Sequence, residues 1–268
     1  MNLLEVLRAG ACALAVLPVF GCASLPETCV PTRVPDSAQN PYWAGEGYWN
    51  RRHAAKLAEI AAGPKDYDCV FVGDSITHNW EGWSDPIDVE KVTRQYEKGR
   101  LKFPNGPGRA VWEELKGKYA LLNLGIGGDS TQHVLWRLEN GEMDGYRTRF
   151  VMLMIGANNG QPAADIAAGV KACVAGIAQR HPEACILLSP IFPSHALATD
   201  PRRLVENEVN AEIRKLADGK KVVWVDFNKR FLTPDGTLTR EMMPDLLHPL
   251  EPGYRIWREA IEPYLETR

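Results

Sequence analysis

Five short apolar runs limit the folds open to this chain more than any other feature of its sequence. Each run consists almost entirely of consecutive apolar residues, without the polar alternation of a strand that has one face in water. The runs lie at residues 69–72, 120–124, 150–155, 186–188 and 222–225. They predict strands that are buried on both faces of a parallel sheet.

Segments in which apolar residues recur at helical spacing alternate with these runs. In residues 163–180, for example, Ile166, Val170, Val174 and Ile177 fall on one helical face. The other predicted helices lie at residues 46–62, 109–118, 130–139 and 201–218, with a last one from Pro252 through Ile261. Strands that alternate with helices in this way predict an α/β fold whose parallel sheet is covered by helices on both faces.

The composition fits one globular domain and argues against nucleic acid as a partner. Of the 268 residues, 45% are hydrophobic and 24% are charged, which suits a single domain of α/β size. Lys and Arg total 31 against 34 Asp and Glu, a formal net charge of −3, and no basic block stands out. We therefore expect no nucleic-acid partner.

The N-terminus has the pattern of an export signal. Residues 9–20 are an uncharged apolar run of twelve, the length of a signal core and too short to span a bilayer, so 1–22 is a predicted signal peptide. Val-Phe-Gly-Cys at 19–22 resembles a bacterial lipoprotein cleavage box, which would make a lipid on Cys22 the only membrane contact. Gly21-Cys22-Ala23 also fits ordinary secretion, and an uncleaved hydrophobic helix is the third alternative.

The rest of the chain is predicted to be a linker and one domain. Four prolines in residues 23–45 predict an extended linker, and residues 46–268 then form the folded domain. We expect the exported domain to be periplasmic, anchored to a membrane or secreted. The domain and linker contain four widely spaced cysteines, which predict buried thiols in preference to a disulfide framework or a metal site: Cys29, Cys69, Cys173 and Cys185.

Three polar or glycine-rich turns follow the first three predicted strands. They read Gly-Asp-Ser at 73–75, Gly-Ile-Gly-Gly-Asp-Ser at 125–130 and Gly-Ala-Asn-Asn at 156–159. Because parallel strands end at the same edge of a sheet, these turns are expected to converge there. Asp74 is predicted to fix its turn by side-chain-to-backbone hydrogen bonds, and His133 to orient the second turn.

The residue types in these turns suit nucleophilic catalysis. The Ser75 hydroxyl needs a base, and His248, three residues after Asp245, provides an imidazole with a carboxylate partner. Asp245 would hold the Nδ1 proton and leave Nε2 facing the serine. The backbone N–H groups of Ser75 and Gly128 and the amide of Asn158 would supply an oxyanion hole.

Other binding sites that glycine-rich turns can form are excluded because required residues are missing. A dinucleotide site would need a third glycine where Ser130 stands, and an acidic residue about twenty positions on. The Gly-Lys-Ser/Thr of a phosphate loop and the His-Glu-x-x-His of a zinc enzyme do not occur.

The order Gly-Asp-Ser, Gly-Ile-Gly-Gly-Asp, Gly-x-Asn-Asn and Asp-x-x-His resembles the SGNH (GDSL) hydrolase family. The run 123–142 is especially similar to the platelet-activating-factor acetylhydrolase branch. The resemblance implies a three-layer, flavodoxin-like sheet of order 2-1-3-4-5 and ester hydrolysis without a metal or cofactor. It also implies a Ser75, Asp245 and His248 triad and an oxyanion hole of Ser75, Gly128 and Asn158.

Two departures from the acetylhydrolase branch bear on the substrate. That branch is intracellular, whereas this chain has an export signal and an expanded segment at 80–108. Exported bacterial members often deacetylate carbohydrates, so we expect an acetylesterase whose substrate is a glycan or small-molecule ester. Trp80 and Trp83 are expected either to stack on a sugar or to anchor their loop. The alternatives are a short-chain lipid, lysophospholipid or platelet-activating-factor-like esterase, an acyltransferase, and a non-catalytic glycan-binding lipoprotein.

Overall fold

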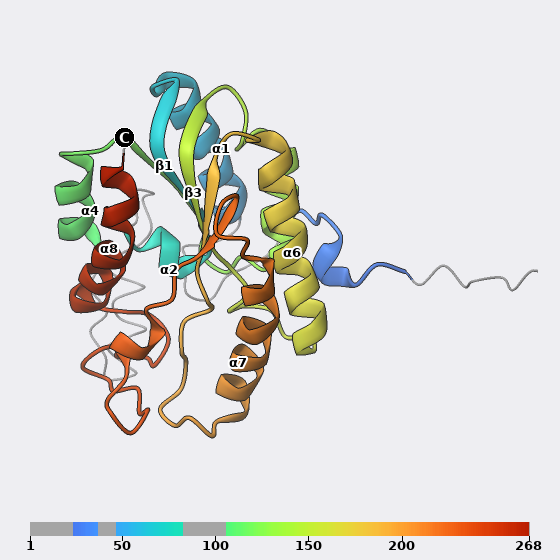
Figure 1. Cartoon of the computed structure of the whole chain (residues 1–268). Helices are drawn as coiled ribbons and strands as arrows, with labels where there is room; N and C mark the ends of the chain where they lie inside the picture. The colour runs from blue at the N-terminus through green and yellow to red at the C-terminus, as the bar shows by residue number, and fades with distance from the viewer. Residues whose placement is uncertain (1–23, 37–46, 83–105, 268) are drawn as a thin grey trace, which may run out of the picture.

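A computed structural model describes residues 24–36, 47–82 and 106–267 of the chain. It contains a five-stranded parallel sheet in the order β2-β1-β3-β4-β5, which confirms the predicted α/β class and strand order. The strands are β1 (Asp66–Gly73), β2 (Leu121–Gly125), β3 (Arg147–Met154), β4 (Cys185–Leu188) and β5 (Val222–Trp224). Figure 1 shows them in the middle of the molecule.

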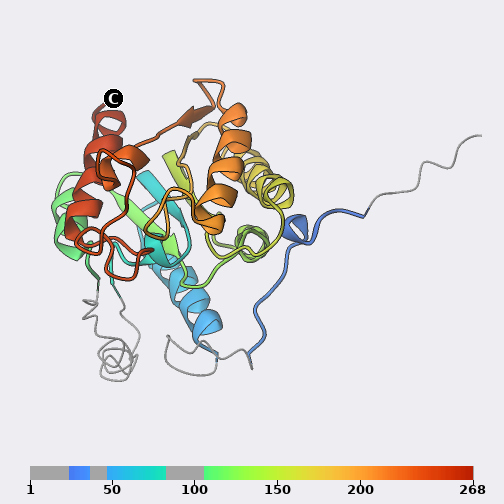
Figure 2. The ribbon, with the colours of Figure 1, turned by 90° about the horizontal axis from the view of Figure 1, so that it is seen from below.

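Helices cover both faces of the sheet, as Figures 1 and 2 show. One face packs against α1 (Tyr48–Ala62), α5 (Thr131–Glu139), α6 (Ala163–Arg180) and α7 (Pro201–Ile213). The other packs against α2 (Ser75–His78), α4 (Arg109–Lys116), α8 (Glu251–Glu266) and the 3₁₀ turn η3 (Asn228–Phe231). Successive residues of β1 alternate between the two cores, with Val70 and Val72 in the first and Cys69 and Phe71 in the second.

Strand register brings the ends of three strands to one level. Gly73 at the end of β1 pairs with Gly125 of β2 on one side and with Met154 of β3 on the other. The turns that follow these strands therefore begin next to one another at the carboxyl edge of the sheet. This register is what allows residues from distant parts of the sequence to form one site.

Element boundaries mostly follow the sequence pattern. The helix predicted at 163–180 coincides with α6, and the helix predicted at 46–62 begins at Tyr48. The predicted 201–218 helix instead ends as α7 at Ile213 and continues as the 3₁₀ turn η2 (Arg214–Leu216). β3 starts at Arg147, before the predicted apolar run, because its polar beginning pairs with Asp66 of β1.

The described part of the predicted linker, residues 24–36, packs against the domain. Its 3₁₀ turn η1 (Glu27–Cys29) carries Thr28, which is fully buried. The Thr28 hydroxyl donates to the carbonyl of Asp165 at 2.6 Å, and its own carbonyl accepts from the Thr131 hydroxyl at 2.9 Å. This segment is thus docked on α5 and α6, where Figure 1 shows it, rather than an unattached tether.

The signal segment and Cys22 lie outside the described residues. Within the described ranges, no helix is both long and apolar enough to cross a membrane. The four cysteines in those ranges are free thiols, and burial raises the pKa of Cys69 and of Cys173.

Candidate active site

The first turn places Ser75 at the start of a helix. Asp74 caps α2, because its Oδ1 accepts from the backbone N–H of Ile76 at 2.9 Å, as the sequence predicts. Gly73 is required by close packing, since a Cβ there would lie 2.1 Å from Oγ1 of Thr77 and 2.4 Å from the Met154 carbonyl. A strand, a glycine and a capped helix therefore fix the Ser75 side chain at the edge of the sheet.

Ser75, His248 and Asp245 are brought together by the fold. Ser75 Oγ lies 2.7 Å from Nε2 of His248, and Nδ1 of His248 lies 2.6 Å from Oδ2 of Asp245. The other carboxylate oxygen, Oδ1, accepts from the backbone N–H groups of Leu247 at 3.1 Å and His248 at 2.8 Å. The carboxylate thus fixes both the imidazole ring and the loop that carries it.

The electrostatics of Asp245 suit its position behind the imidazole. Burial alone would raise the pKa of its carboxyl, but the hydrogen bond and charge of His248 and two backbone N–H donors hold the pKa below its ordinary value. An ionised Asp245 keeps the proton on Nδ1 and leaves the Nε2 lone pair directed at Ser75. This arrangement can remove a proton from the hydroxyl as the hydroxyl attacks a carbonyl carbon.

The second and third turns contain N–H groups and follow strands whose ends are level with the end of β1. Gly128 has a φ of +85°, in the left-handed region that favours glycine. Asn158 Nδ2 donates one hydrogen to the Asp129 carbonyl at 2.8 Å, which leaves its second hydrogen for a ligand. Within the described residues the backbone N–H groups of Ser75 and Gly128 have no acceptor. The sequence predicts these groups as oxyanion donors, and that role stays a prediction.

A buried ionic cluster beneath the second turn is the part of the site that sequence reasoning missed. Asp129 accepts from Nε1 of Trp49 at 2.5 Å and from Nε of Arg137 at 2.8 Å. Arg137 also contacts the Glu142 carboxylate, which lies 2.6 Å from Nδ1 of His53. The available signal was Arg137 itself, since it shares the inward face of α5 with apolar residues.

His133 closes the start of α5 as the sequence predicts. Its Nδ1 accepts from the backbone N–H of Ser130 at 3.1 Å, and the Ser130 side chain caps the helix in return. His133 therefore orients the second turn through the backbone of Ser130.

The position of Trp80 contradicts the first of its two expected roles, which was to stack on a sugar. Trp80 is fully buried. Its ring centroid lies 4.9 Å from that of Tyr254 and 5.3 Å from that of Trp257, within the core between α2, α4 and α8. Because α8 packs directly over the residues after α2, the ring anchors this layer, which is the other role expected for it. Trp83 lies outside the described residues.

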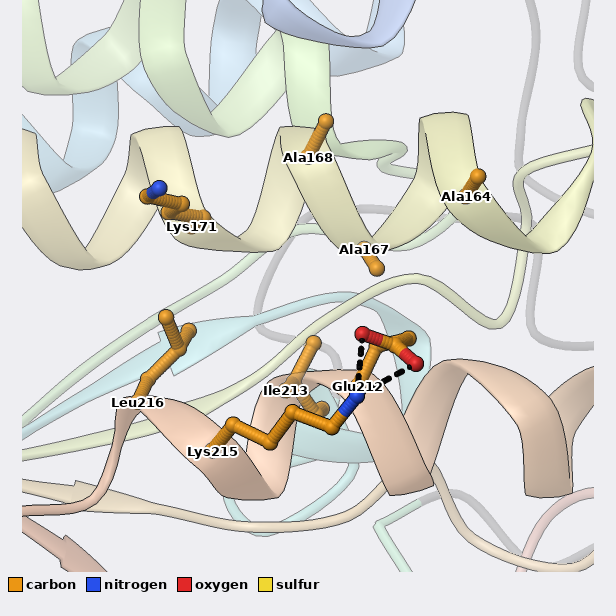
Figure 3. Close-up of a pocket in the computed structure, with 8 residues that line it drawn as sticks. All are labelled: Ala164, Ala167, Ala168, Lys171, Glu212, Ile213, Lys215 and Leu216. Atoms are coloured by element: carbon orange, nitrogen blue, oxygen red, sulfur yellow. Dashed lines mark hydrogen bonds and ion pairs between the residues drawn. The ribbon is translucent and has the colours of Figure 1, made fainter.

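A pocket between α6 and α7 carries no catalytic arrangement. It has a volume of about 470 Å³ and is drawn in Figure 3. The residues that line it are Ala164, Ala167, Ala168, Lys171, Glu212, Ile213, Lys215 and Leu216. Its charged groups include the exposed pair of Lys215 with Glu212 at 2.7 Å, and no nucleophile lies beside a base. Among the residues with described coordinates, no group of three His, Cys, Asp or Glu is placed to bind a metal ion.

The doubly wound parallel sheet, with Ser75, His248 and Asp245 in contact at its carboxyl edge, fits the class of α/β ester hydrolases, and sequence comparison identifies the family. Residues 71–256 match the model of the GDSL-like Lipase/Acylhydrolase family, so the chain belongs to that family and is an ester hydrolase. The alpha1 subunit of platelet-activating factor acetylhydrolase IB from Bos taurus is 32% identical over 212 residues, covering 78% of this chain and 79% of the relative.

Two further proteins resemble the chain. The alpha2 subunit of platelet-activating factor acetylhydrolase IB from Rattus norvegicus is 30% identical over 229 residues, covering 84% of this chain and 85% of the relative. A mutant of an acetyl-xylooligosaccharide esterase from Geobacillus Stearmophilus has a similar structure, with a TM-score of 0.52 and 20% identity over 77% of this chain and 96% of the other. The structural similarity supports the fold.

Proposed function

We propose that the chain is an exported acetylesterase that removes O-acetyl groups from carbohydrate through an acyl-enzyme on Ser75. The observation that carries the catalytic part is the continuous relay from Ser75 Oγ to His248 at 2.7 Å and from His248 to Asp245 at 2.6 Å. A serine hydroxyl held in this way is a general-base-activated nucleophile.

The first half of the reaction follows from the atoms that face one another. His248 Nε2 takes the hydroxyl proton while Ser75 Oγ attacks the ester carbonyl carbon, and negative charge develops on the carbonyl oxygen. The N–H groups of Ser75 and Gly128 and the second hydrogen of Asn158 Nδ2 stabilise that charge, each by about 3 kcal/mol. His248 then gives its proton to the departing alcohol oxygen, which leaves an ester of acetate on Ser75.

The second half repeats the same chemistry with water. His248 removes a proton from a water molecule, whose oxygen attacks the acyl carbon of the acyl-enzyme. The same donors stabilise the second oxyanion, and the proton returns from His248 to Ser75 Oγ as acetate leaves. Asp245 remains ionised throughout and stabilises the imidazolium that forms in each half.

The acetyl group is the part of the substrate with the broadest support. The relatives are acetylhydrolases by name, and the structural neighbour from Geobacillus is an acetyl-xylooligosaccharide esterase by title. The carbohydrate alcohol rests on the predicted export signal and on that neighbour. Trp80 no longer supports a sugar contact, because its ring is buried.

A short-chain lipid or platelet-activating-factor-like ester is the second candidate substrate. It is favoured by the relatives at 30–32% identity, which are platelet-activating factor acetylhydrolase subunits. An acyltransferase would share the acyl-enzyme and exclude water from it. A non-catalytic glycan-binding lipoprotein fits least well, because nothing in the triad geometry is incomplete.

Hydrolysis of p-nitrophenyl acetate tests the nucleophile, and natural esters test the substrate. We expect Ser75→Ala to lower kcat by about 10⁴-fold or more without changing the fold, because no other nucleophile replaces the hydroxyl. An unchanged rate in this variant would overturn the assignment of Ser75. Acetate release should be faster from acetylated xylan than from a short-chain acetylated phospholipid, and the reverse order would favour the lipid ester.

Export and lipidation at Cys22 need a separate test. We expect the full chain, expressed in a bacterium fed a labelled fatty acid, to become labelled and to fractionate with membranes. Cys22→Ser should lose the label, whereas Ser75→Ala should keep it. Release of an unlabelled wild-type chain into the periplasm or medium would favour ordinary secretion.

A further inference from the structure

Arg137 is a fully buried cation in the layer directly beneath the proposed oxyanion donors. It projects from the inward face of α5, where a guanidinium is costly unless each of its N–H groups finds an acceptor. None of the proposed chemical steps uses it.

The guanidinium joins the ends of two strands to the second turn. Nη2 donates to the carbonyl of Gly73, two residues before Ser75, at 3.3 Å, and Nη1 donates to the carbonyl of Leu124 at 2.8 Å. Nε and Nη2 both contact Oδ2 of Asp129, at 2.8 and 2.7 Å. Nη1 also contacts Glu142, so the contacts equal in number the five N–H groups of a guanidinium.

Asp129 connects Arg137 to the third turn. Its side chain is held by Arg137, and its backbone carbonyl accepts from Asn158 Nδ2 at 2.8 Å. The orientation of the Asn158 amide therefore depends on where Asp129 lies. Gly128, the residue before Asp129, moves with the same segment of backbone.

We propose that Arg137 is a positioning residue that aligns the oxyanion hole by joining the three turns that form it. This proposal rests on the proposed function, because it assigns Arg137 a role in that same reaction. Arg137 acts through the Asp129 carbonyl on Asn158 and through the Gly73 carbonyl on the Ser75 turn. It does not touch substrate.

The surrounding charges explain why arginine occupies this position. Burial opposes the charge of Arg137, but Glu142 and Asp129 outweigh it and raise the pKa of the guanidinium above its ordinary value. The planar fork of donors reaches carbonyls and carboxylates in different directions at once, which a lysine ammonium on a single stem does not. Arg137→Lys should therefore keep the charge and lose part of the alignment.

A double-mutant cycle with Asn158→Ala separates positioning from a general structural role. On p-nitrophenyl acetate, Arg137→Met should lower kcat by about 10- to 100-fold with KM changed less than about twofold, because oxyanion donors act in the transition state. In the Asn158→Ala background the same substitution should lower kcat by only about threefold, since the positioned amide is already absent. Arg137→Lys should fall between wild type and Arg137→Met.

A control variant and measurements of folding distinguish positioning by Arg137 from general destabilisation. Arg180→Met removes another arginine, whose exposed contact is Asp144 at 2.9 Å, and should leave kcat unchanged. Circular dichroism and thermal unfolding check each variant, and if Arg137→Met does not fold, Arg137→Lys and Glu142→Gln take its place in the cycle. Equal losses with and without Asn158, or a loss confined to KM, would overturn the proposal. Failure of the proposed function differs, because Ser75→Ala would then retain activity.

Discussion

Ser75 is the first residue of α2 and follows β1, an inner strand of the sheet, whereas Asp245 and His248 lie in irregular chain between η3 and α8. β1 has a neighbouring strand on both sides, and the ionic cluster around Arg137 lies beneath its end. The nucleophile side is therefore fixed by backbone pairing and buried charge. The histidine side lies outside the described strands, so it lacks the support of backbone pairing between strands.

Contacts between loops, instead of pairing between strands, hold the segment that carries Asp245 and His248. The carbonyl of Leu246 accepts from the backbone N–H of His195 at 2.9 Å, so the segment after β4 supports the segment that carries His248. That support is itself tied to α7, because Glu206 accepts from the Ser194 hydroxyl at 2.5 Å and from its N–H at 3.0 Å. The histidine side is thus held by one loop, which is held in turn by a helix.

The two sides of the site also differ in the pKa of a buried carboxyl group, Asp74 on one side and Asp245 on the other. Complete burial raises the pKa of Asp74 to about 7, although the Ile76 N–H and His248 oppose this rise. Asp74 Oδ2 has no partner in the described structure. Asp245, with imidazole and backbone donors, has a pKa below its ordinary value. The nucleophile side thus contains a fully buried carboxyl group, Asp74, whose pKa is raised. The histidine side depends on the ionised carboxylate of Asp245.

Asp245→Asn should have the largest effect on this comparison. An amide in place of the carboxylate no longer favours the proton on Nδ1 and no longer stabilises the imidazolium, so kcat should fall by about 10³- to 10⁴-fold. Steady-state hydrolysis of p-nitrophenyl acetate measures the change. A loss of less than tenfold would mean that the histidine side is oriented by its loop contacts alone.

Asp74→Asn should change stability by an amount that depends on pH. The folded-state pKa of Asp74, about 7, exceeds its unfolded value, so the folded state binds more protons between these values and wild-type stability falls as pH rises through that window. Asparagine does not ionise and removes this loss. Relative to wild type, the variant should therefore gain stability between pH 5 and pH 8, on the order of 2 kcal/mol.

Urea unfolding of both proteins at the two pH values measures this gain. Asp245 titrates in the opposite sense, because its lowered pKa gives stability that is present above the unfolded value and is lost only in acid. A constant difference between wild type and Asp74→Asn at both pH values would mean that Asp74 is not strained by its burial.

Glu206→Gln tests the support of the histidine side. Glutamine has one acceptor oxygen in place of two and no charge for Arg202, so the free energy of unfolding should fall by about 1 to 2 kcal/mol. We also expect kcat to fall several-fold, because the 194–196 segment no longer holds the Leu246 carbonyl as firmly. Glu212→Gln on the same helix, where the side chain is exposed and pairs with Lys215, is the matched control and should change neither quantity.

The sequence predicts regular elements of this protein better than the contacts between loops. α6 and the three turns follow from local periodicity and from motif residues, because strand ends of a parallel sheet converge whatever the loops do. The burial of Trp80 and of Thr28 depends on segments distant in sequence, α8 in one case and α5 with α6 in the other. Local pattern carries no information on such partners.

The backbone conformation of Leu246 should give the smallest of the effects predicted here. Its φ is +60°, in the left-handed region that costs a leucine about 1 to 2 kcal/mol and that nothing in Asp-Leu-Leu-His signals. Leu246→Gly and Leu246→Ala both remove the side chain, but only glycine relieves the backbone. After the entropy cost of glycine, Leu246→Gly should be more stable than Leu246→Ala by about 0.5 to 1 kcal/mol in urea unfolding, with similar kcat. If alanine is the more stable variant, the histidine loop adopts this conformation without strain, and its difference from the nucleophile turn is one of packing alone.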